Sequence, residues 1–236
     1  MMKHPNFWGF SKRVEFCVVT LINYFFGRGL QLIIYFLQGL TLGLSATATP
    51  GPFQAFLLAQ TLKNGWKRTL PATLAPLVSD GPIIYLVLLV LTQTPAWFLN
   101  VLQIIGGLFV LYLATGALAA LNIHSAPPEI STEAGHQDFF KAVVMNFLSP
   151  GPYLFWSVIA GPIVLEGWRQ SPSLGLSFAI GFYGALIGGF VAFIILFATA
   201  SQLGPKVSQV LKLVSALALF IFGLFQLWTG VMSLIG

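Results

Sequence analysis

The stretch TATPGPFQAFLLAQ, Thr47 to Gln60, places two prolines and a glycine inside an uncharged run that otherwise has the composition of a membrane-spanning helix. Pro50 and Pro52 each remove a backbone N–H donor, so a helix must break or kink there. In hydrocarbon, the carbonyls that lose those donors are costly to leave unpaired. The stretch therefore predicts a broken helix at a place where protein or a wet cavity satisfies the freed groups.

The rest of the chain has the composition of an integral membrane protein. Of its 236 residues, 57% are hydrophobic and 7% are charged, whereas about 25% are charged in an average soluble domain. Uncharged runs, each longer than the ~20 residues that cross a hydrocarbon core, extend over 29–62, 81–123, 142–165, 170–205 and 213–236. We therefore expect an all-α polytopic membrane protein that is embedded in the lipid bilayer.

Several other classes of protein are excluded. The net charge of +5 comes from eleven Lys and Arg residues, nearly all near predicted helix ends, which suits membrane orientation better than a nucleic-acid surface. Cys17 is the only cysteine, so an intrachain disulfide and a CxxC metal or redox site are both excluded. The sequence has neither HExxH nor GxSxG. We expect no enzyme, no cofactor, no metal ion and no nucleic-acid partner.

Polar and proline-containing breaks divide the apolar runs into six core helices. These are predicted near 38–62, 70–92, 97–121, 140–165, 173–200 and 207–234. The longest connection, HSAPPEISTEAGHQD, covers residues 124–138 and falls midway. It is predicted to be a polar linker between a first three-helix half at 38–123 and a second at 139–236.

An internal repeat supports this division. FLSPGPYLFW, Phe147 to Trp156, is similar to TATPGPFQAF, Thr47 to Phe56, at an offset of 100 residues. Three crossings are an odd number, so the second half must enter the membrane from the opposite side. The sequence therefore predicts inverted-topology repeats, an architecture typical of secondary transporters.

Residues 1–37 form an N-terminal extension to this repeat. Val14 to Leu37 is apolar and interrupted by Gly27-Arg28-Gly29, and this element either crosses the bilayer or lies along its surface. Positive charge in short loops marks the cytoplasmic side of the membrane. The loops after the second and fourth core helices carry only Arg169, whereas the other loops carry Lys63, Lys67, Arg68, Lys141, Lys206 and Lys212. These other loops are predicted to be cytoplasmic.

Matched helix breaks in two halves of a transporter indicate its binding site, because half-helix ends and unwound carbonyls there face the substrate or the coupling ion. The alternative is a kink or close-packing device. The candidate translocation residues at the two breaks are Thr49, Pro50, Gly51, Pro52, Gln54, Asn146, Ser149, Pro150, Gly151 and Pro152. Their polar side chains either contact substrate or satisfy freed backbone groups.

Asp80, in LAPLVSDGPIIYL, is the only acidic residue inside a predicted span. A carboxylate within a membrane is costly enough to be a functional hypothesis by default. It either binds and releases a proton during transport or pairs with a substrate amine. The alternative is a side chain near the helix end that extends to the interface. We include Asp80 in the predicted translocation site.

At these positions the sequence resembles the lysine-exporter (LysE/RhtB) superfamily of small bacterial amino-acid exporters. The matching features are the TPGP of the first core helix, Gly65 in the following turn, Asp80, and NFLSPGPYLFW, Asn146 to Trp156, which is similar to the family's Asn-x-x-Asn-Pro element. The resemblance covers residues 38–234. The N-terminal extension lies outside the family pattern, and Ser149 stands where Asn is frequent.

The resemblance implies a six-helix exporter in the bacterial cytoplasmic (inner) membrane. Such a protein moves amino acids or related small metabolites outward in exchange for protons or other cations, and it is a homodimer. Its substrate is a small molecule. The residues alone leave two alternatives open, a passive small-solute channel, which inverted repeats also permit, and a non-transporting membrane assembly protein.

Overall fold

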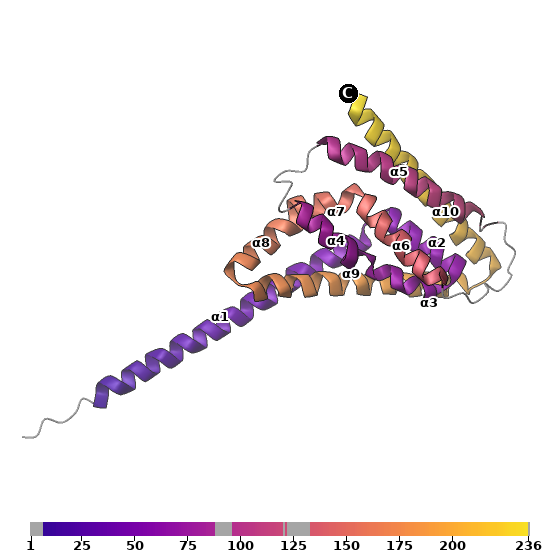
Figure 1. Ribbon diagram of the computed structural model, residues 1–236. Helices are drawn as coiled ribbons and strands as arrows, with labels where there is room; N and C mark the ends of the chain where they lie inside the picture. The colour runs from indigo at the N-terminus through magenta and orange to yellow at the C-terminus, as the bar shows by residue number, and fades with distance from the viewer. Residues whose placement is uncertain (1–6, 88–95, 120, 122–132, 236) are drawn as a thin grey trace, which may run out of the picture.

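A computed structural model describes residues 7–87, 96–119, 121 and 133–235, and these ranges form helices without a β-strand (Figure 1). The α-helices are α1 (Phe7–Ala48), α2 (Pro52–Asn64), α3 (Trp66–Thr69), α4 (Ala75–Tyr85), α5 (Ala96–Ala119), α6 (Glu133–Leu148), α7 (Pro150–Leu154), α8 (Gly161–Gln170), α9 (Pro172–Ser201) and α10 (Pro205–Ile235). Two further helical segments are the 3-10 helix η1 (Leu70–Leu74) and the π-helix η3 (Phe155–Ala160).

Four helices in the described part of the chain are long and apolar enough to cross a membrane. They are Gly27–Ala48, Trp97–Ala119, Pro172–Ser201 and Pro205–Ser233, and the bent pair Gly135–Leu148 plus Pro150–Gln170 makes a fifth if it counts as one span. The predicted all-α polytopic membrane fold is confirmed. The expected helix at 70–92 begins instead as η1 and α4, with Pro71 and Pro76 in their first turns, whereas α4 continues through Pro82.

Both predicted PGP breaks are present. The first separates α1 from α2, with Gly51 in extended conformation before the first residue of α2, Pro52. The second separates α6 from α7 at Ser149, also extended, where the chain bends by 53°. Pro52 and Pro150 are the first residues of the new helices. The N–H of a first helical residue has no intrahelical acceptor, so its absence in proline costs the helix no hydrogen bond.

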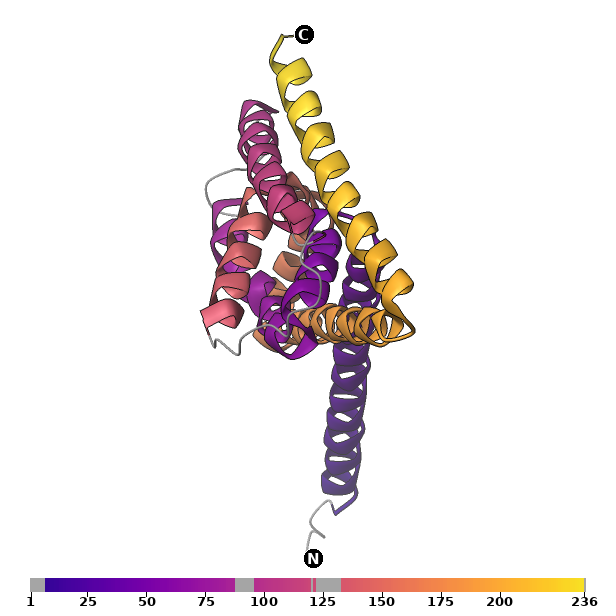
Figure 2. The ribbon, with the colours of Figure 1, turned by 90° about the vertical axis from the view of Figure 1, so that its right-hand side faces the viewer.

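The N-terminal prediction is wrong in one respect, because no break occurs at Gly27-Arg28-Gly29. Helix α1 runs without interruption from Phe7 to Ala48, through the expected boundary between residues 37 and 38. Glycine costs a helix only about 1 kcal/mol, and between the two glycines the Arg28 guanidinium donates to the hydroxyl of Ser171, at the start of α9, at 2.9 Å. The N-terminal part of α1 extends beyond the other helices (Figures 1 and 2).

The predicted linker is also too long at its C-terminal end. Glu133 to Asp138 form the first turns of α6, where the Asp138 carboxylate accepts a hydrogen bond from Asn64 at 2.7 Å. This contact ties the start of α6 to the end of α2 and extends the helix into the polar segment. Residues 124–132 of the linker and the break expected at 92–95 lie outside the described residues.

Helices α1 and α9 run parallel and in close contact. The hydroxyl of Ser177 donates to the carbonyl of Leu32 at 2.7 Å, and further along the pair Gly189 lies against Thr47. A Cβ atom on Gly39 would overlap the carbonyl oxygen of Phe178. Small residues at such positions allow two membrane helices to approach at backbone distance.

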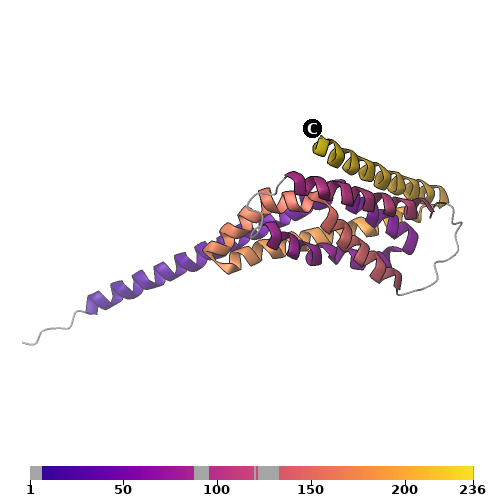
Figure 3. The same ribbon diagram turned by 45° about the horizontal axis from the view of Figure 1, so that its top comes forward.

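A corresponding parallel contact joins α6 to the η1–α4 region. Gly135 lies against the carbonyl of Arg68, which is in α3 two residues before η1, and further along both segments Asn146 donates to Asp80. Helices α5 and α10 pack antiparallel, with Gly107 against Gly223 and Ile104 against Gly230 (Figures 1 and 3). The first helix of each half therefore packs on the second helix of the other half, and the two third helices pack on each other.

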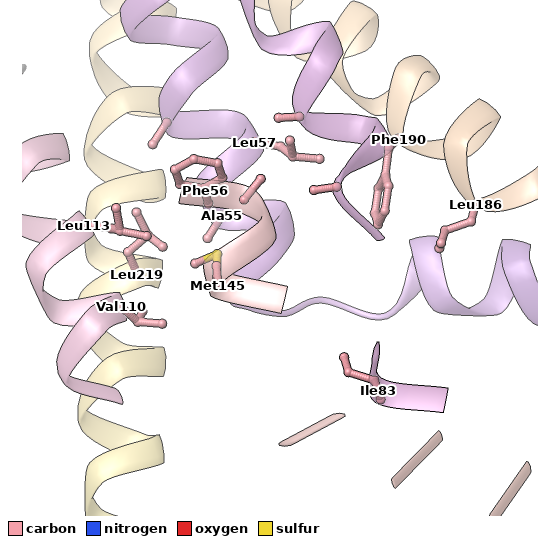
Figure 4. Packing of buried hydrophobic residues seen from close by; sticks show 14 of the residues in the cluster. Ala55, Phe56, Leu57, Ile83, Val110, Leu113, Met145, Leu186, Phe190 and Leu219 are labelled. Atoms are coloured by element: carbon pink, nitrogen blue, oxygen red, sulfur yellow. The ribbon is translucent and has the colours of Figure 1, made fainter. Parts of the chain in front are cut away.

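The buried core lies where these pairs meet. Phe56 and Leu57 of α2 are fully buried, and Figure 4 shows Met145 of α6 beside Phe56, with Leu219 of α10 nearby. Helix α2 therefore packs against α6, α9 and α10. At the break before it, Thr49 and Pro50 are exposed.

Gly39→Ala is expected to destabilise the protein, because the added methyl group would meet backbone atoms of α9 that cannot rotate away. Overpacking of this kind costs about 1–3 kcal/mol, which should lower the thermal midpoint of the purified protein. Gly184→Ala is the matched control, since a Cβ there meets nothing within 4 Å. Equal thermal midpoints for the two variants would contradict the close contact between α1 and α9.

Candidate functional site

The two helix breaks face one cavity of about 490 Å³. This volume is in the range of small-molecule sites, about 300–1,000 Å³. Every residue selected from the sequence lines this cavity, namely Thr49, Pro50, Gly51, Pro52, Gln54, Asp80, Asn146, Ser149, Pro150, Gly151 and Pro152. The structure therefore brings the two PGP elements and the acidic residue of α4 together at one place.

Asp80 is 4% exposed, and its carboxyl group is held by donors from other parts of the chain. The amide of Asn146 donates to Oδ1 at 2.8 Å, and the hydroxyl of Tyr183 donates to Oδ2 at 3.2 Å. The side chain of Trp156, which also lines the cavity, lies beside this carboxyl group. The two donors lie on α6 and α9, so the Asp80 carboxyl group connects α4 to both of these helices.

Asn146 has a positioning role in this arrangement. Its Nδ2 also donates to the hydroxyl oxygen of Ser79 at 2.7 Å, and the Ser79 hydroxyl donates to the carbonyl of Ala75 at 3.0 Å. The amide of Asn146 therefore bridges two successive residues of α4 and fixes the orientation of the Asp80 carboxyl group.

The polar side chains at the first break bind freed backbone carbonyls. Gln54 Nε2 donates to the carbonyl of Thr49 at 2.6 Å and lies 3.3 Å from that of Ala46. The hydroxyl of Thr49 donates to the carbonyl of Ser45 at 2.8 Å. The Gln54 bonds satisfy acceptors that the end of α1 leaves without intrahelical donors, whereas the Ser45 carbonyl also accepts from the N–H of Thr49.

The second break is satisfied in the same way. Ser149 Oγ donates to the carbonyl of Met145 at 2.7 Å, and the hydroxyl of Tyr153 donates to that of Phe147 at 2.9 Å. Of the two roles open to Thr49, Gln54 and Ser149, the described contacts are therefore those of backbone satisfaction. At both breaks, side chains of the break itself therefore supply hydrogen bonds to nearby backbone carbonyls.

One charged side chain, that of Asp80, is present among the described residues that line the cavity. These lining residues include no Lys, Arg or His, so the carboxyl group has hydrogen-bond donors but no cationic partner within the cavity wall. In the part of the chain that the structure describes, no group of three His, Cys, Asp or Glu side chains could hold a metal ion.

Sequence reasoning missed several residues of the cavity wall. Trp156 lines the cavity, and Tyr183 bonds Asp80 from outside the lining. Neither is distinguishable in the sequence from the other aromatic residues, which also populate lipid-facing surfaces. Gln226 of α10 lines the cavity as well, and its isolation within an apolar helix is a signal that could have identified it. The remaining wall is largely aromatic and consists of Phe53, Phe155, Phe182, Phe190, Phe222 and Phe225, with Ala46, Pro76 and Leu186.

Asp138 is a second buried acid, 1% exposed, which the sequence analysis placed in the linker. The Asn64 amide that bonds it also donates to Gln60 Oε1 at 3.1 Å. The charges of Lys141 and Lys63 also act on this carboxyl group. The cluster joins the ends of α2 and α6 and does not line the cavity.

A multi-pass helical membrane protein with two broken helices around a central cavity has the architecture of a membrane transporter. Residues 44–230 match the model of the LysE type translocator family, and the chain belongs to this family. It is similar to a protein of Bacillus subtilis (strain 168) named "Putative amino acid efflux protein YcgF", with 27% identity over 209 residues that cover 85% of this chain and 99% of the relative. No solved structure matches the chain.

These matches confirm the family resemblance seen in the sequence. The protein is a multi-pass membrane transporter. The matched residues begin at 44, so the N-terminal extension lies outside the family model.

Proposed function

We propose that the protein exports amino acids or related small metabolites across the bacterial cytoplasmic membrane, coupled to the movement of protons or another cation. Membership of the translocator family and the similarity to a protein named for amino acid efflux support this proposal. The observation that carries it is the convergence of both PGP breaks and Asp80 on one cavity.

The cavity suits a molecule that carries both charges of an amino acid. Helix α2 begins at the cavity wall, and its N-cap Gly51 supplies no side-chain cap. The first N–H groups of a helix have no intrahelical partner and favour an anion, as does the positive end of the helix dipole. A substrate carboxylate is therefore accommodated at the start of α2, and a substrate ammonium is attracted by Asp80.

Alternating access follows from the proposed inverted repeats, 38–123 and 139–236. The helix contacts support this symmetry. If the two halves are exchanged, the α1–α9 contact becomes the contact between α6 and the η1–α4 region. The α5–α10 contact joins the third helices of both halves, so it is unchanged by the exchange. Rocking of one half against the other around the cavity would open it to each side in turn.

Coupling to a cation follows from the charge of Asp80. An ionised carboxylate without a counter-charge is expensive in a membrane, and the described cavity wall offers no cationic side chain. The charge must therefore be compensated by a proton, a substrate amine or a coupling cation. The outward direction of transport in this proposal is supported by the similarity to a protein named for amino acid efflux.

An export screen tests the proposed function. Cells are loaded with dipeptides, and the intracellular concentration of each released amino acid is compared with and without the protein. We expect at least one amino acid to accumulate to a several-fold lower level when the protein is present, and we expect an uncoupler to remove the difference. If no solute depends on the protein, the export function is wrong. Flux that does not saturate in proteoliposomes would indicate the channel instead.

A further inference from the structure

The two oxygens of the Asp80 carboxyl group have different partners. Oδ1 accepts a hydrogen bond from the amide of Asn146 at 2.8 Å, and Oδ2 accepts one from the hydroxyl of Tyr183 at 3.2 Å. An ionised carboxylate offers about four lone-pair positions, so each oxygen keeps a position for a proton. Asn146 lines the cavity, whereas Tyr183 does not. The two oxygens are therefore different sites for a proton.

The amide of Asn146 can only donate to Asp80. The hydroxyl of Ser79 donates to the carbonyl of Ala75 at 3.0 Å, so the Ser79 oxygen accepts from Asn146 Nδ2 at 2.7 Å. An amide turned by 180° would place its own oxygen against both the Ser79 and the Asp80 acceptors. In the observed orientation Nδ2 uses both of its hydrogens, and an amide nitrogen accepts no hydrogen bond. A proton on Oδ1 that pointed at Asn146 would meet a donor.

The hydroxyl of Tyr183 can take either role. A hydroxyl group has one hydrogen to donate and two acceptor positions. It donates to Oδ2 when Asp80 is ionised. When a proton forms an O–H bond at Oδ2, the Tyr183 oxygen can accept the hydrogen bond from it. The hydrogen of Tyr183 then rotates out of the contact and stays on its own oxygen, so the tyrosine gains and loses no proton.

No charged side chain competes for this proton among the described residues. Of the side chains beside the Asp80 carboxyl group, which are those of Asn146, Trp156 and Tyr183, only Tyr183 is titratable. Neither η1 nor α7, which pack against α4, carries a charged residue, and neither does α9. The hydroxyl of Tyr153 in α7 donates elsewhere, to the carbonyl of Phe147. The titratable residues of α6 precede Asn146 by more than one turn and are Glu133, His136, Asp138 and Lys141.

We propose that the coupling proton binds at Oδ2 of Asp80 and that Tyr183 is the positioning residue of this proton site, donating to the ionised carboxylate and accepting from the protonated acid. Oδ1 keeps its bond to Asn146 in both states. Asp80 and Tyr183 belong to different halves of the proposed repeat, so the bond that reverses joins the two halves that rock. This inference rests on the proposed function, in that the coupling ion must be a proton.

The test reads both groups by infrared difference spectroscopy of the purified full-length protein in lipid, between alkaline and acidic pH. The carbonyl band of a protonated carboxyl group is assigned to Asp80 by its absence in Asp80→Asn. The phenolic C–O band, whose frequency differs between a donating and an accepting hydroxyl, is assigned to Tyr183 by its absence in Tyr183→Phe. We expect the Tyr183 band to shift on acidification with the same pH midpoint at which the Asp80 band appears.

Asp80→Asn should hold Tyr183 in the accepting role at every pH. The oxygen of the new asparagine accepts from Asn146, so its Nδ2 lies toward Tyr183 and donates where the protonated acid would donate. The Tyr183 band of this variant should therefore have the frequency of the acidified wild type at both pH values. If the variant folds poorly, the shift in the wild type still tests the reversal.

Tyr183→Phe should make the Asp80 carboxyl band appear at a pH about one unit higher than in the wild type. A hydrogen bond to a charged group is stronger than one between neutral groups, so the ionised form loses more stabilisation and the acid keeps its proton to higher pH. The pH profile of net export should move in the same direction. Tyr35→Phe is the matched control, because Tyr35 also packs against the core but lies outside the cavity. It should leave the Asp80 band and the export profile unchanged.

The inference is overturned if the Tyr183 band of the wild type has the same frequency at acidic and alkaline pH, or if Asp80→Asn leaves it at the alkaline frequency. An unchanged midpoint of the Asp80 band in Tyr183→Phe would overturn the positioning role, and so would the lack of any Asp80 carboxyl band while the protein is folded. The proposed function fails by a different result, in which the wild type exports no amino acid, and the infrared titration does not depend on export.

Discussion

Asp80→Asn is expected to abolish net export driven by a proton gradient while leaving solute exchange between the two sides of the membrane. Asparagine keeps the shape of the carboxyl group and can still accept the hydrogen bond from Asn146, but it cannot gain or lose a proton. In proteoliposomes, net export should fall to background in a pH gradient, while counterflow of labelled amino acid between equal concentrations persists.

Asp138→Asn is the matched control, because Asp138 is equally buried but lies outside the cavity. Its transport rate and pH dependence should match those of the wild type. Loss of exchange and binding together in Asp80→Asn would assign Asp80 to direct pairing with the substrate amine. Wild-type transport and pH dependence in Asp80→Asn would contradict any role of this acid in translocation.

Pro50→Ala and Pro150→Ala are each expected to abolish transport with little loss of expression. Alanine restores a backbone donor and favours helix at both breaks, so the carbonyls now satisfied by the Gln54 and Ser149 side chains would re-enter continuous helices. A continuous helix at either break would close the cavity at the place where that break now faces it. Initial export rates and protein levels in membranes measure the two effects separately.

Pro172→Ala is the control for these substitutions. Pro172 also opens a helix, α9, but it does not line the cavity, and its replacement should leave transport intact. Full activity in both Pro50→Ala and Pro150→Ala would show that the PGP pair serves only helix packing.

The breaks and most helix ends could be predicted because their causes are local. A proline removes a donor wherever the chain places it, and the turn at Gly65, with φ of 83°, follows from the conformational freedom of glycine. The uncharged runs likewise identified the long spans, because their length relative to a bilayer depends on composition alone.

The remaining features depend on contacts between distant residues. Asp138 is helical and buried because it meets Asn64, 74 residues earlier in the sequence, and Asp80 meets Tyr183, 103 residues later. The continuity of α1 through Gly27-Arg28-Gly29 is accompanied by the hydrogen bond from Arg28 to Ser171, 143 residues later. Gln226 has no motif around it, and its place in the cavity wall depends on how α10 packs against the other helices.

The central claim is that the cavity between the two broken helices holds the exported amino acid. Gly151 lines this cavity, and a side-chain atom there would meet nothing within 4 Å, so Gly151→Cys in a Cys17→Ala background places one thiol in the site. The measurement is its rate of reaction with a membrane-permeant thiol reagent, with and without the amino acid identified by the export screen. We predict that saturating amino acid slows this reaction several-fold and leaves Gly184→Cys, outside the cavity, unaffected. Equal rates at Gly151→Cys with and without the amino acid, in a protein that still exports it, would contradict the claim.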